Sequence, residues 1–349
     1  MEQENIKKIG THSGCFHADE VLACVMLTKY TKDYKDAEII RTRDSQILDQ
    51  MDLVVDVGGV YEPERHRYDH HQKSFTGTLE YDKYDKTKLS GAGLIYKHFG
   101  KEVIQNVINE ILSDVKLKIK LDTKDPQLLE QIYKKVYGSF LEAVDGIDNG
   151  VNQYSTDLKP NYRETTNYGA RIGRLNTTWS VEGEEEDVQF KKAMPIAQEE
   201  LVWQVRNALL KWYPARPIVL EALKNRFNVH ESGAIIKLDQ SVPVDSHLYD
   251  LEEELNIKGQ IKFVLFPEGV NSKAWRVKAI NLENSFELRN PLKKEWRGIK
   301  DIQQLKEISK IDDIVFVHVS GFIGGARSYE SAFKMATLSL EEQKEEKQQ

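Results

Sequence analysis

Histidine and aspartate side chains gather in four short stretches of the first 150 residues. The four stretches are THSGCFHADE at residues 11–20, LVVDVGG at 53–59, RYDHHQKSF at 67–75 and EAVDGIDNG at 142–150. Imidazole and carboxylate groups together are the ligand set that suits Mn²⁺, Zn²⁺ or Fe²⁺, whereas ligands that are all oxygen favour Mg²⁺ or Ca²⁺. We therefore predict a metal centre, with these ligands: His12, His17, Asp19, Asp56, His70 and Asp145.

The number of candidate ligands predicts more than one metal ion. A single tetrahedral site needs only three or four ligands. Two cations about 3.5 to 4 Å apart, bridged by one carboxylate, are typical of enzymes that hydrolyse phosphate esters. Asp56 interrupts an apolar run and is the predicted bridge, because Gly58 and Gly59 leave space around it. Taken singly, each residue also has a structural explanation, such as Asp19 at a helix start. Their grouping within one predicted domain favours the metal site.

The two adjacent histidines are expected to have different roles, because neighbouring side chains point in different directions. We predict that His70 binds metal and that His71 is catalytic, donating a proton to the leaving group or contacting the phosphate. Asp69 would orient one of the two rings through a hydrogen bond. Asp148, followed by Asn149 and Gly150, is better explained as a helix-ending turn.

The pattern of apolar residues predicts the elements that position these side chains. Residues 6–14 have the pattern of a strand, 18–30 that of a helix, and 37–43 and 51–59 those of strands, with room for one helical turn between the last two. This succession predicts a parallel α/β sheet, at whose carboxyl edge ligands bind. Helices are expected over 91–112 and 125–150, the latter with Asp125 as N-cap and Pro126 as its first residue.

The length of 349 residues predicts two domains. We expect the first domain to end near residue 150 and a linker and cleft segment to occupy 151–183. An α+β domain is expected over 184–340, with a long helix at 184–212, a helix at 214–227, and strands at 234–238, 261–267, 275–282 and 313–320. Residues 341–349 are expected to be a frayed acidic tail.

Composition excludes several classes of protein. The chain is 40% hydrophobic and 30% charged, which predicts a globular, soluble protein. No apolar run approaches the roughly 20 residues that span a bilayer, so we expect no membrane association. The net charge is −7, but the acidic residues cluster at 182–187 and in the tail, which leaves room for a local basic groove. With two cysteines and no signal-peptide pattern at the N-terminus, an intracellular location is predicted.

Six ordered blocks of sequence resemble a known family. DHH at 69–71 resembles the signature of the DHH phosphoesterase superfamily. The blocks THSGCFHADEVLA, VVDVGGVY, RYDHHQKSF, AVDGIDNG, YGARIGRLN and HVSGFIGGARSYESAFKMA are similar to the melanocyte-proliferating-gene-one family. The resemblance covers about residues 6 to 338. It implies an α/β fold with an N-terminal, parallel-sheet, DHH-like catalytic domain and a C-terminal α+β domain.

The resemblance also implies an activity, which is a metal-dependent 3′–5′ exonuclease that acts on RNA in the nucleus, cytoplasm or mitochondrion. The cofactors implied are two divalent cations, Mn²⁺ first, with Mg²⁺ or Zn²⁺ as alternatives. His12, His17 and Asp19 would match the first motif of the superfamily, Asp56 the second, His70 and His71 the third and Asp145 the fourth. His17 stands where the superfamily more usually has aspartate, which shifts the metal preference away from Mg²⁺.

Two other segments are candidates for binding the substrate. In GFIGGARS, at 321–328, Gly324 and Gly325 would let backbone N–H groups approach a phosphate beside Arg327, with His318 facing the cleft. The same glycines would also permit a tight turn and close packing of a helix. Between the domains, basic and aromatic residues alternate in a manner suited to contacting phosphates and stacking bases: Tyr162, Tyr168, Arg171, Arg174 and Trp179.

Two other functions remain open. A phosphatase or pyrophosphatase for small nucleotides could use the same metals in a shorter, closed cleft. A metal-binding scaffold would hold the metal without turnover. The sequence identifies no obligate protein partner.

Overall fold

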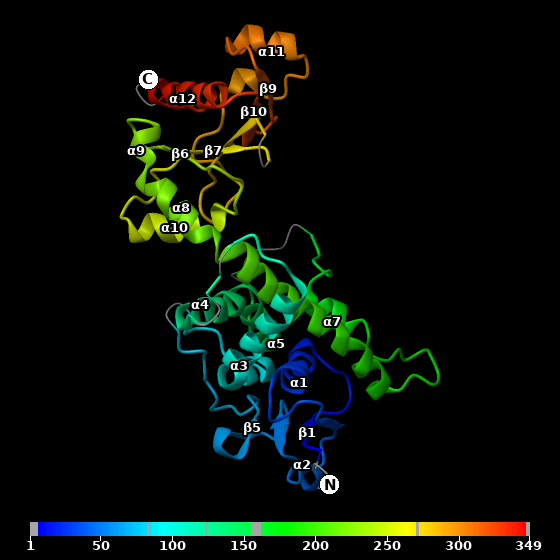
Figure 1. Ribbon diagram of the computed structural model, residues 1–349. Coiled ribbons are helices and arrows are strands. Elements are labelled where there is room, and N and C mark those ends of the chain that lie inside the picture. Colours follow the sequence, from blue (N-terminus) through cyan, green and yellow to red (C-terminus); the bar gives the residue numbers. More distant parts are fainter. Residues whose placement is uncertain are drawn as a thin grey trace. The chain divides into compact units, whose positions relative to one another are not determined.

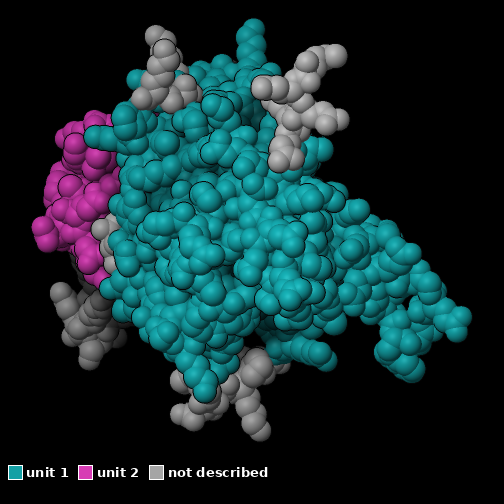
Figure 2. Space-filling model, turned by 90° about the horizontal axis from the view of Figure 1, so that it is seen from below, with its two compact units in different colours: residues 1–213 teal, residues 214–349 magenta. Residues whose placement is uncertain are grey.

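A computed structural model describes residues 6–81, 84–119, 121–122, 125–154, 162–269 and 272–346. The chain forms two compact units, 1–213 and 214–349, which are drawn in different colours in Figure 2. We describe each unit by itself.

The first unit contains a mostly parallel five-stranded sheet in the order β2-β1-β3-β5-β4 (Figure 1). Only β4 is antiparallel, to β5, and β1 pairs in parallel with both β2 and β3. The predicted α/β class with a parallel sheet is therefore confirmed, although the short β4 and β5 were not foreseen. The strands are β1 (Lys8–Thr11), β2 (Glu38–Arg41), β3 (Leu53–Val55), β4 (Tyr61–Glu62) and β5 (Arg67–Tyr68).

Helices cover both faces of this sheet. Leu53 and Val55 enter the main core with α1, whereas Val54, which points to the other face, packs with Leu48 of α2. The predicted helices and the helical turn between β2 and β3 are present, and Asp125 caps α4 by accepting a bond from the backbone N–H of Gln127. The helices are α1 (Ala18–Tyr30), α2 (Ser45–Leu48), η1 (Pro63–Arg65), α3 (Gly91–Asp114), α4 (Pro126–Val136), α5 (Glu142–Asp148), α6 (Tyr168–Gly173) and α7 (Glu186–Asn207), with π-helical turns η2 (Tyr137–Leu141) and η3 (Ala208–Trp212).

The division between the units lies at 213/214 and not near residue 150. The reason is apolar packing, because α7 lies against α1 and α3 and Phe190, Ala197 and Leu201 are buried in the same core. The segment expected to be a linker, 151–183, contributes α6 and the buried Ile172 to this unit, although 155–161 lie outside the described residues.

The second unit has a mixed sheet in the order β6-β7-β8-β10-β9, with helices on both faces. Alternate residues of β6 show this, because Ile235 packs with α12 residues and Ile236 with α8 and α10 residues. Its strands are β6 (Ile235–Lys237), β7 (Phe263–Pro267), β8 (Trp275–Ala279), β9 (Ile314–Val317) and β10 (Ile323–Ala326), and its helices are α8 (Ala215–Lys224), α9 (Arg226–Val229), α10 (Asp245–Glu254), η4 (Lys294–Trp296), α11 (Ile302–Ser309) and α12 (Tyr329–Glu346).

Two features of the second unit differ from the expectations. Residues 341–346, expected to be frayed, continue α12, and 347–349 lie outside the described residues. The glycine-rich segment forms strand β10 rather than a turn. As in the sequence, no described helix is long and apolar enough to cross a bilayer.

Candidate metal centre

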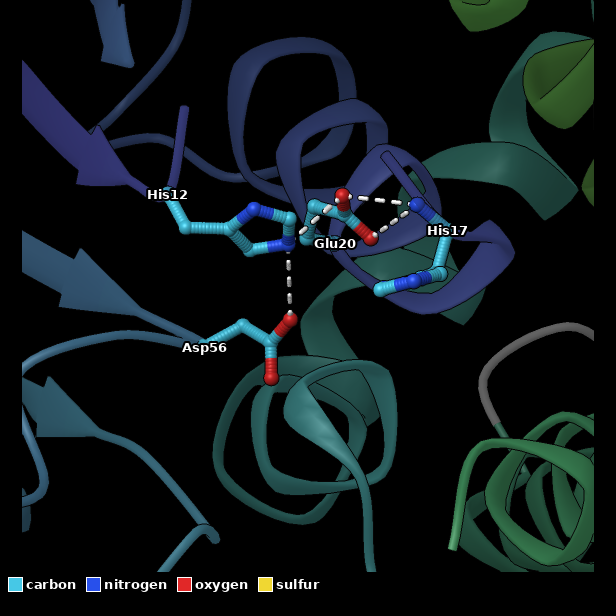
Figure 3. A group of neighbouring side chains, drawn as sticks. All are labelled: His12, His17, Glu20 and Asp56. Atoms are coloured by element: carbon cyan, nitrogen blue, oxygen red, sulfur yellow. Dashed lines mark hydrogen bonds and ion pairs between the residues drawn. The ribbon is translucent and has the colours of Figure 1, made fainter. Parts of the chain in front are cut away.

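The predicted ligands meet where three neighbouring strands of the first sheet end. His12 directly follows β1, Asp56 follows β3, and Asp69 begins the segment after β5. Carboxyl ends of parallel strands share one edge of a sheet, and this edge is the usual ligand site of such folds. Figure 3 shows His12 and Asp56 leaving two adjacent strands towards the same point, with Glu20 of α1 approaching from the opposite side.

His12 is buried between two carboxylates (Figure 3). Its Nε2 lies 2.9 Å from Glu20 Oε1 and 3.5 Å from Asp56 Oδ2. Burial lowers the pKa of His12, but its hydrogen bonds to Asp56 and Glu20 outweigh burial and raise the pKa to about 10. Glu20 is held in turn by the backbone N–H of His17, which donates to both of its oxygens. The two carboxylates therefore favour a positive charge at this point, on the His12 ring or on a cation.

Asp56 connects two sides of the site. Oδ2 faces His12, while Oδ1 lies 3.2 Å from Nε2 of His70. Burial raises the pKa of Asp56, but its contacts with His12 and His70 prevail and lower it to about 2. Its backbone has φ 59°, a left-handed conformation that is uncommon outside glycine and is often found at functional sites. Gly58 and Gly59, also at positive φ, continue the turn.

The ring of His70 is oriented by Asn149. The Asn149 amide Nδ2 donates to the carbonyls of Lys88 and Asp145, both at 2.9 Å. Its Oδ1 therefore faces His70 Nδ1, at 3.2 Å, and accepts the proton on that nitrogen. In a neutral ring this leaves Nε2 as a bare lone pair, the state that binds a metal. Nε2 also lies 3.1 Å from Asp148 Oδ2.

His71 and Asp69 form a pair beside the ligands. His71 Nδ1 lies 2.7 Å from Asp69 Oδ1, and the His71 side chain is 62% exposed. The other oxygen of Asp69 accepts the backbone N–H of Gly59 at 2.5 Å. Asp69 is itself buried, so both of its oxygens are committed to the protein. The structure therefore places Asp69 against His71, and not against His70.

Asp19, in the first turn of α1, is buried with its carboxylate against the N-terminus of α3. The backbone N–H of Gly91 donates to Asp19 Oδ2 at 3.2 Å. A Cβ atom on Gly91 would lie 2.8 Å from Asp56 Cβ and 3.1 Å from Asp19 Oδ2, so glycine is required for this approach. Burial, together with the charges of Asp56 and Glu20, raises the pKa of Asp19 well above its usual value.

These side chains form three groups that could each hold a cation: His12, His17, Glu20 and Asp56; Asp56, Asp69, His70 and His71; and His17, Asp19 and Asp148. Asp56 belongs to two of them. Three buried atoms, Asp19 Oδ1, Asp56 Oδ1 and His70 Nε2, make no hydrogen bond of regular geometry to any described residue. Bare oxygen and nitrogen atoms that converge in a buried site fit divalent cations.

Sequence reasoning missed two members of these groups. Glu20 forms an ordinary capping box with the N-cap residue His17, and this local pattern gave no reason to expect the contact of Glu20 with His12. Asp148 fits a helix-ending turn, and α5 does end at Asp148. The signal that could have found it is its spacing of three residues from Asp145, which places both on one side of a helix.

Asp145, a predicted ligand, lies outside the three groups. Its Oδ1 accepts bonds from the backbone N–H and the hydroxyl of Ser90, and Oδ2 accepts from the Tyr137 hydroxyl at 2.9 Å. Burial raises the pKa of Asp145 to about 7, although these hydrogen bonds lower it. Asp145 ties the first residues of α3 to α5, and its assignment as a ligand stays a prediction.

The predicted basic and aromatic residues of 162–179 have different surroundings in the structure. Tyr168 donates its hydroxyl to the Ala18 carbonyl at 3.1 Å, whereas Tyr162 and Trp179 are largely exposed. Arg171 lies 3.6 Å from Glu200, and Arg174 donates to the Thr165 carbonyl.

The predicted phosphate-binding glycines belong to the second unit. Gly324 and Gly325 lie in β10, between β8 and β9, so their backbone groups take part in the sheet. A Cβ on Gly324 would meet Met335 of α12, as expected for glycines that permit close helix packing. The structure therefore corrects the expectation that their N–H groups approach a phosphate. Two neighbours of these glycines, His318 and Arg327, are exposed.

Comparison with known proteins identifies the family. A model of the uncharacterised protein family UPF0160, named for the MYG1 exonuclease, matches residues 8–340. The MYG1 protein of Dictyostelium discoideum is 45% identical over 95% of this chain and 96% of its own length. The proteins called MYG1 exonuclease in Bos taurus and Homo sapiens are 43% and 42% identical, over 95% of this chain and 84% and 85% of theirs. The resemblance of the six sequence blocks to this family is thereby confirmed, and the chain belongs to the MYG1 exonuclease family.

Proposed function

We propose that this protein is a metal-dependent phosphodiesterase, a 3′–5′ exonuclease on single-stranded RNA that uses two divalent cations, with Mn²⁺ preferred. The observation that carries the proposal is Asp56, a buried carboxylate whose two oxygens face two different histidines. A carboxylate placed in this way suits a bridge between two cations. The bovine and human relatives are called exonucleases, which supports hydrolysis of phosphodiester bonds as the reaction.

The ligands divide around Asp56. One cation would be held by Asp56 with His12 and Glu20. The other would be held by Asp56 with His70, whose Nε2 also lies 3.1 Å from Asp148 Oδ2, and Asp148 groups in turn with Asp19 and His17. When bound, such cations supply charge neutralisation of the phosphate and an acidified water molecule. The imidazole nitrogens favour Mn²⁺ or Zn²⁺ over Mg²⁺.

His71 is the proposed proton donor to the leaving oxygen. With Nδ1 bound to Asp69, the protonated ring presents its Nε2–H away from that carboxylate, and the side chain is 62% exposed to a substrate. The Asp69 carboxylate fixes the orientation of the ring through its bond to Nδ1. Asp69 thus acts through His71 and does not touch the substrate.

Exposed aromatic and basic side chains support RNA as the substrate. Tyr162 and Trp179, exposed aromatic residues of the first unit, can stack on bases, and Arg171 and Arg174 can contact phosphates. In the second unit, the exposed His318 and Arg327 are available to a substrate. Cys15 and Cys24 are both free thiols, which supports an intracellular location in the nucleus, cytoplasm or mitochondrion.

The test is hydrolysis of a 5′-labelled single-stranded RNA with Mn²⁺, Mg²⁺ or a chelator. Asp56→Asn removes the bridging charge at nearly constant volume, and Asp49→Asn is the matched control, an exposed aspartate seven residues earlier. We expect stepwise shortening that needs metal, is lost in Asp56→Asn and persists in Asp49→Asn. Turnover of a free dinucleotide but not of RNA would replace the proposal by a small-nucleotide phosphatase. Bound metal without turnover of either would replace it by a scaffold.

A further inference from the structure

A cavity of about 480 Å³ opens beside the metal ligands within the first unit. His17, Asp19, His71 and Asp148 line one end of it. Its volume falls in the range of about 300 to 1,000 Å³ that is usual for small-molecule sites, and it leaves room for one nucleoside but not for a folded strand. A group that occupies this cavity therefore lies next to the reacting phosphate.

One wall of the cavity is apolar and belongs to one side of a helix. Phe140, Ala143, Val144 and Ile147 line it at spacings of three and four residues, over the end of η2 and the first two turns of α5. The π-helical turn η2 lies where this wall begins, and such turns are frequent at functional sites. The Phe140 ring meets the Tyr168 ring edge to face, with 5.1 Å between centroids.

A second part of the lining belongs to α6, which meets the first where Tyr168 contacts Phe140. Gly169 and Gly173 line it together with Tyr168, Asn167 and Asn176. Glycine residues leave a flat surface at which a planar ring can lie close to the backbone. An apolar wall and glycine positions within one cavity suit a planar aromatic group, which stacks without needing hydrogen bonds.

Three polar side chains of the lining, Asn176, Asn167 and Tyr168, are already committed to hydrogen bonds within the protein. Asn176 accepts from the backbone N–H of Phe16 and donates to the Phe16 carbonyl, both at 2.8 Å. Asn167 caps α6 by accepting the N–H of Ala170 at 2.8 Å, and the Tyr168 hydroxyl donates to Ala18. These groups are not available to read the edge of a base, so the cavity would accept any of the four.

We propose that this cavity binds the terminal nucleoside of the RNA strand, by stacking its base against the α5 and α6 walls without regard to base identity. This inference rests on the proposed function and deepens it. It explains how one enzyme can remove successive nucleotides of any sequence. Because each base has a stacking face, recognition of this kind is tolerant of sequence.

The experiment fills the cavity and, separately, removes the base. Ala143→Phe places a ring in the cavity from an exposed position of α5, so folding should be retained. Ile119→Phe is the control, because Ile119 is 45% exposed and lies five residues beyond the end of α3 that is remote from the site. Each protein is assayed on RNA with a normal and with an abasic terminal nucleotide, and Mn²⁺ binding is measured by calorimetry.

We expect wild type and Ile119→Phe to prefer the normal end by about ten-fold or more in kcat/KM, the range of base stacking on aromatic side chains. We expect Ala143→Phe to lose this preference, to cleave the abasic RNA as wild type does, and to bind Mn²⁺ unchanged. The four terminal bases should differ by less than this preference. Equal cleavage of normal and abasic ends by wild type, or an unchanged preference in Ala143→Phe, would overturn the inference.

A measurement of binding separates this inference from the proposed function. If neither wild type nor the control cleaves RNA, the exonuclease proposal fails, and the cavity is judged by calorimetric titration with adenosine monophosphate. Binding by wild type and Ile119→Phe, weakened ten-fold or more in Ala143→Phe, would support a nucleoside site on its own. Equal binding by all three proteins, or none by wild type, would refute it.

Discussion

The orientation of His70 by Asn149 gives a quantitative prediction. Asn149→Ala removes the oxygen that accepts from His70 Nδ1 and the two amide bonds to the Lys88 and Asp145 carbonyls. Each lost amide bond costs about 0.5 to 1.5 kcal/mol, so the free energy of unfolding should fall by about 1 to 3 kcal/mol. Without its acceptor the ring can turn or change tautomer, and such changes beside a ligand weaken metal affinity by about 10- to 100-fold.

Asn149→Asp separates the two effects. The aspartate keeps an oxygen that accepts from His70 Nδ1 but loses the amide donors, so it should share the loss of stability while retaining metal affinity near that of wild type. The assays are chemical denaturation of the metal-free protein and calorimetric titration with Mn²⁺. Metal affinity of Asn149→Ala equal to that of wild type would refute the role of Asn149, and so would equally weak binding by both variants when both are folded.

Four further predictions concern the same site. Because His70 faces Asp56 while the exposed His71 faces Asp69, His70→Ala should reduce Mn²⁺ binding, whereas His71→Ala should bind Mn²⁺ normally and lose turnover with an altered pH profile. Equal metal loss in both would contradict their separate roles. The pKa values of His12 and His70 are raised to about 10, so protons compete with metal, and Mn²⁺ affinity measured from about pH 6.5 to 8.5 should increase. The raised pKa values of these two histidines stabilise the metal-free fold fully below about pH 6.5, and this stabilisation is lost as the pH rises towards 10. Chemical denaturation at several pH values, with chelator present, measures the effect. Gly91→Ala should lower the free energy of unfolding by about 1 to 3 kcal/mol, because the added methyl group would contact Asp56. An unchanged free energy of unfolding and an unchanged metal affinity would show that α3 can move away from Asp56 without cost.

The local pattern of the sequence was sufficient for the first elements. β1, α1, β2 and β3 fall within the predicted segments, because apolar periodicity reports the burial of each element. The short strand β5 has only two residues, Arg67 and Tyr68, which is too few for any period to show. It is nevertheless the strand that delivers Asp69, His70 and His71 to the site. The site was predicted from the grouping of histidine and aspartate residues in the sequence, because the period of so short a strand could not be detected.

Residues with two roles were harder to interpret. Glu20 and Asp148 each satisfy a local helix-end pattern, and only the tertiary structure brings them to His12 and His70. Gly324 and Gly325 follow an apolar segment as phosphate-binding glycines do, but the pairing of β10 with strands on both sides is a long-range contact. The domain boundary near 150 was misplaced for a similar reason, since the packing of α7 on α1 joins residues more than 150 positions apart.

The position of α7 has a consequence for how the protein is synthesised. A growing chain contains every side chain of the metal centre once Asp148 has been added, but the part of α1 that packs against α7 stays uncovered until α7 has been made. The first unit is complete only at residue 213. At translation rates of about 5 to 20 residues per second, this takes roughly 10 to 40 seconds. During the last third of that time the nascent chain carries a full set of ligands on an unfinished core, which is when it would depend most on chaperones and on the supply of the correct metal.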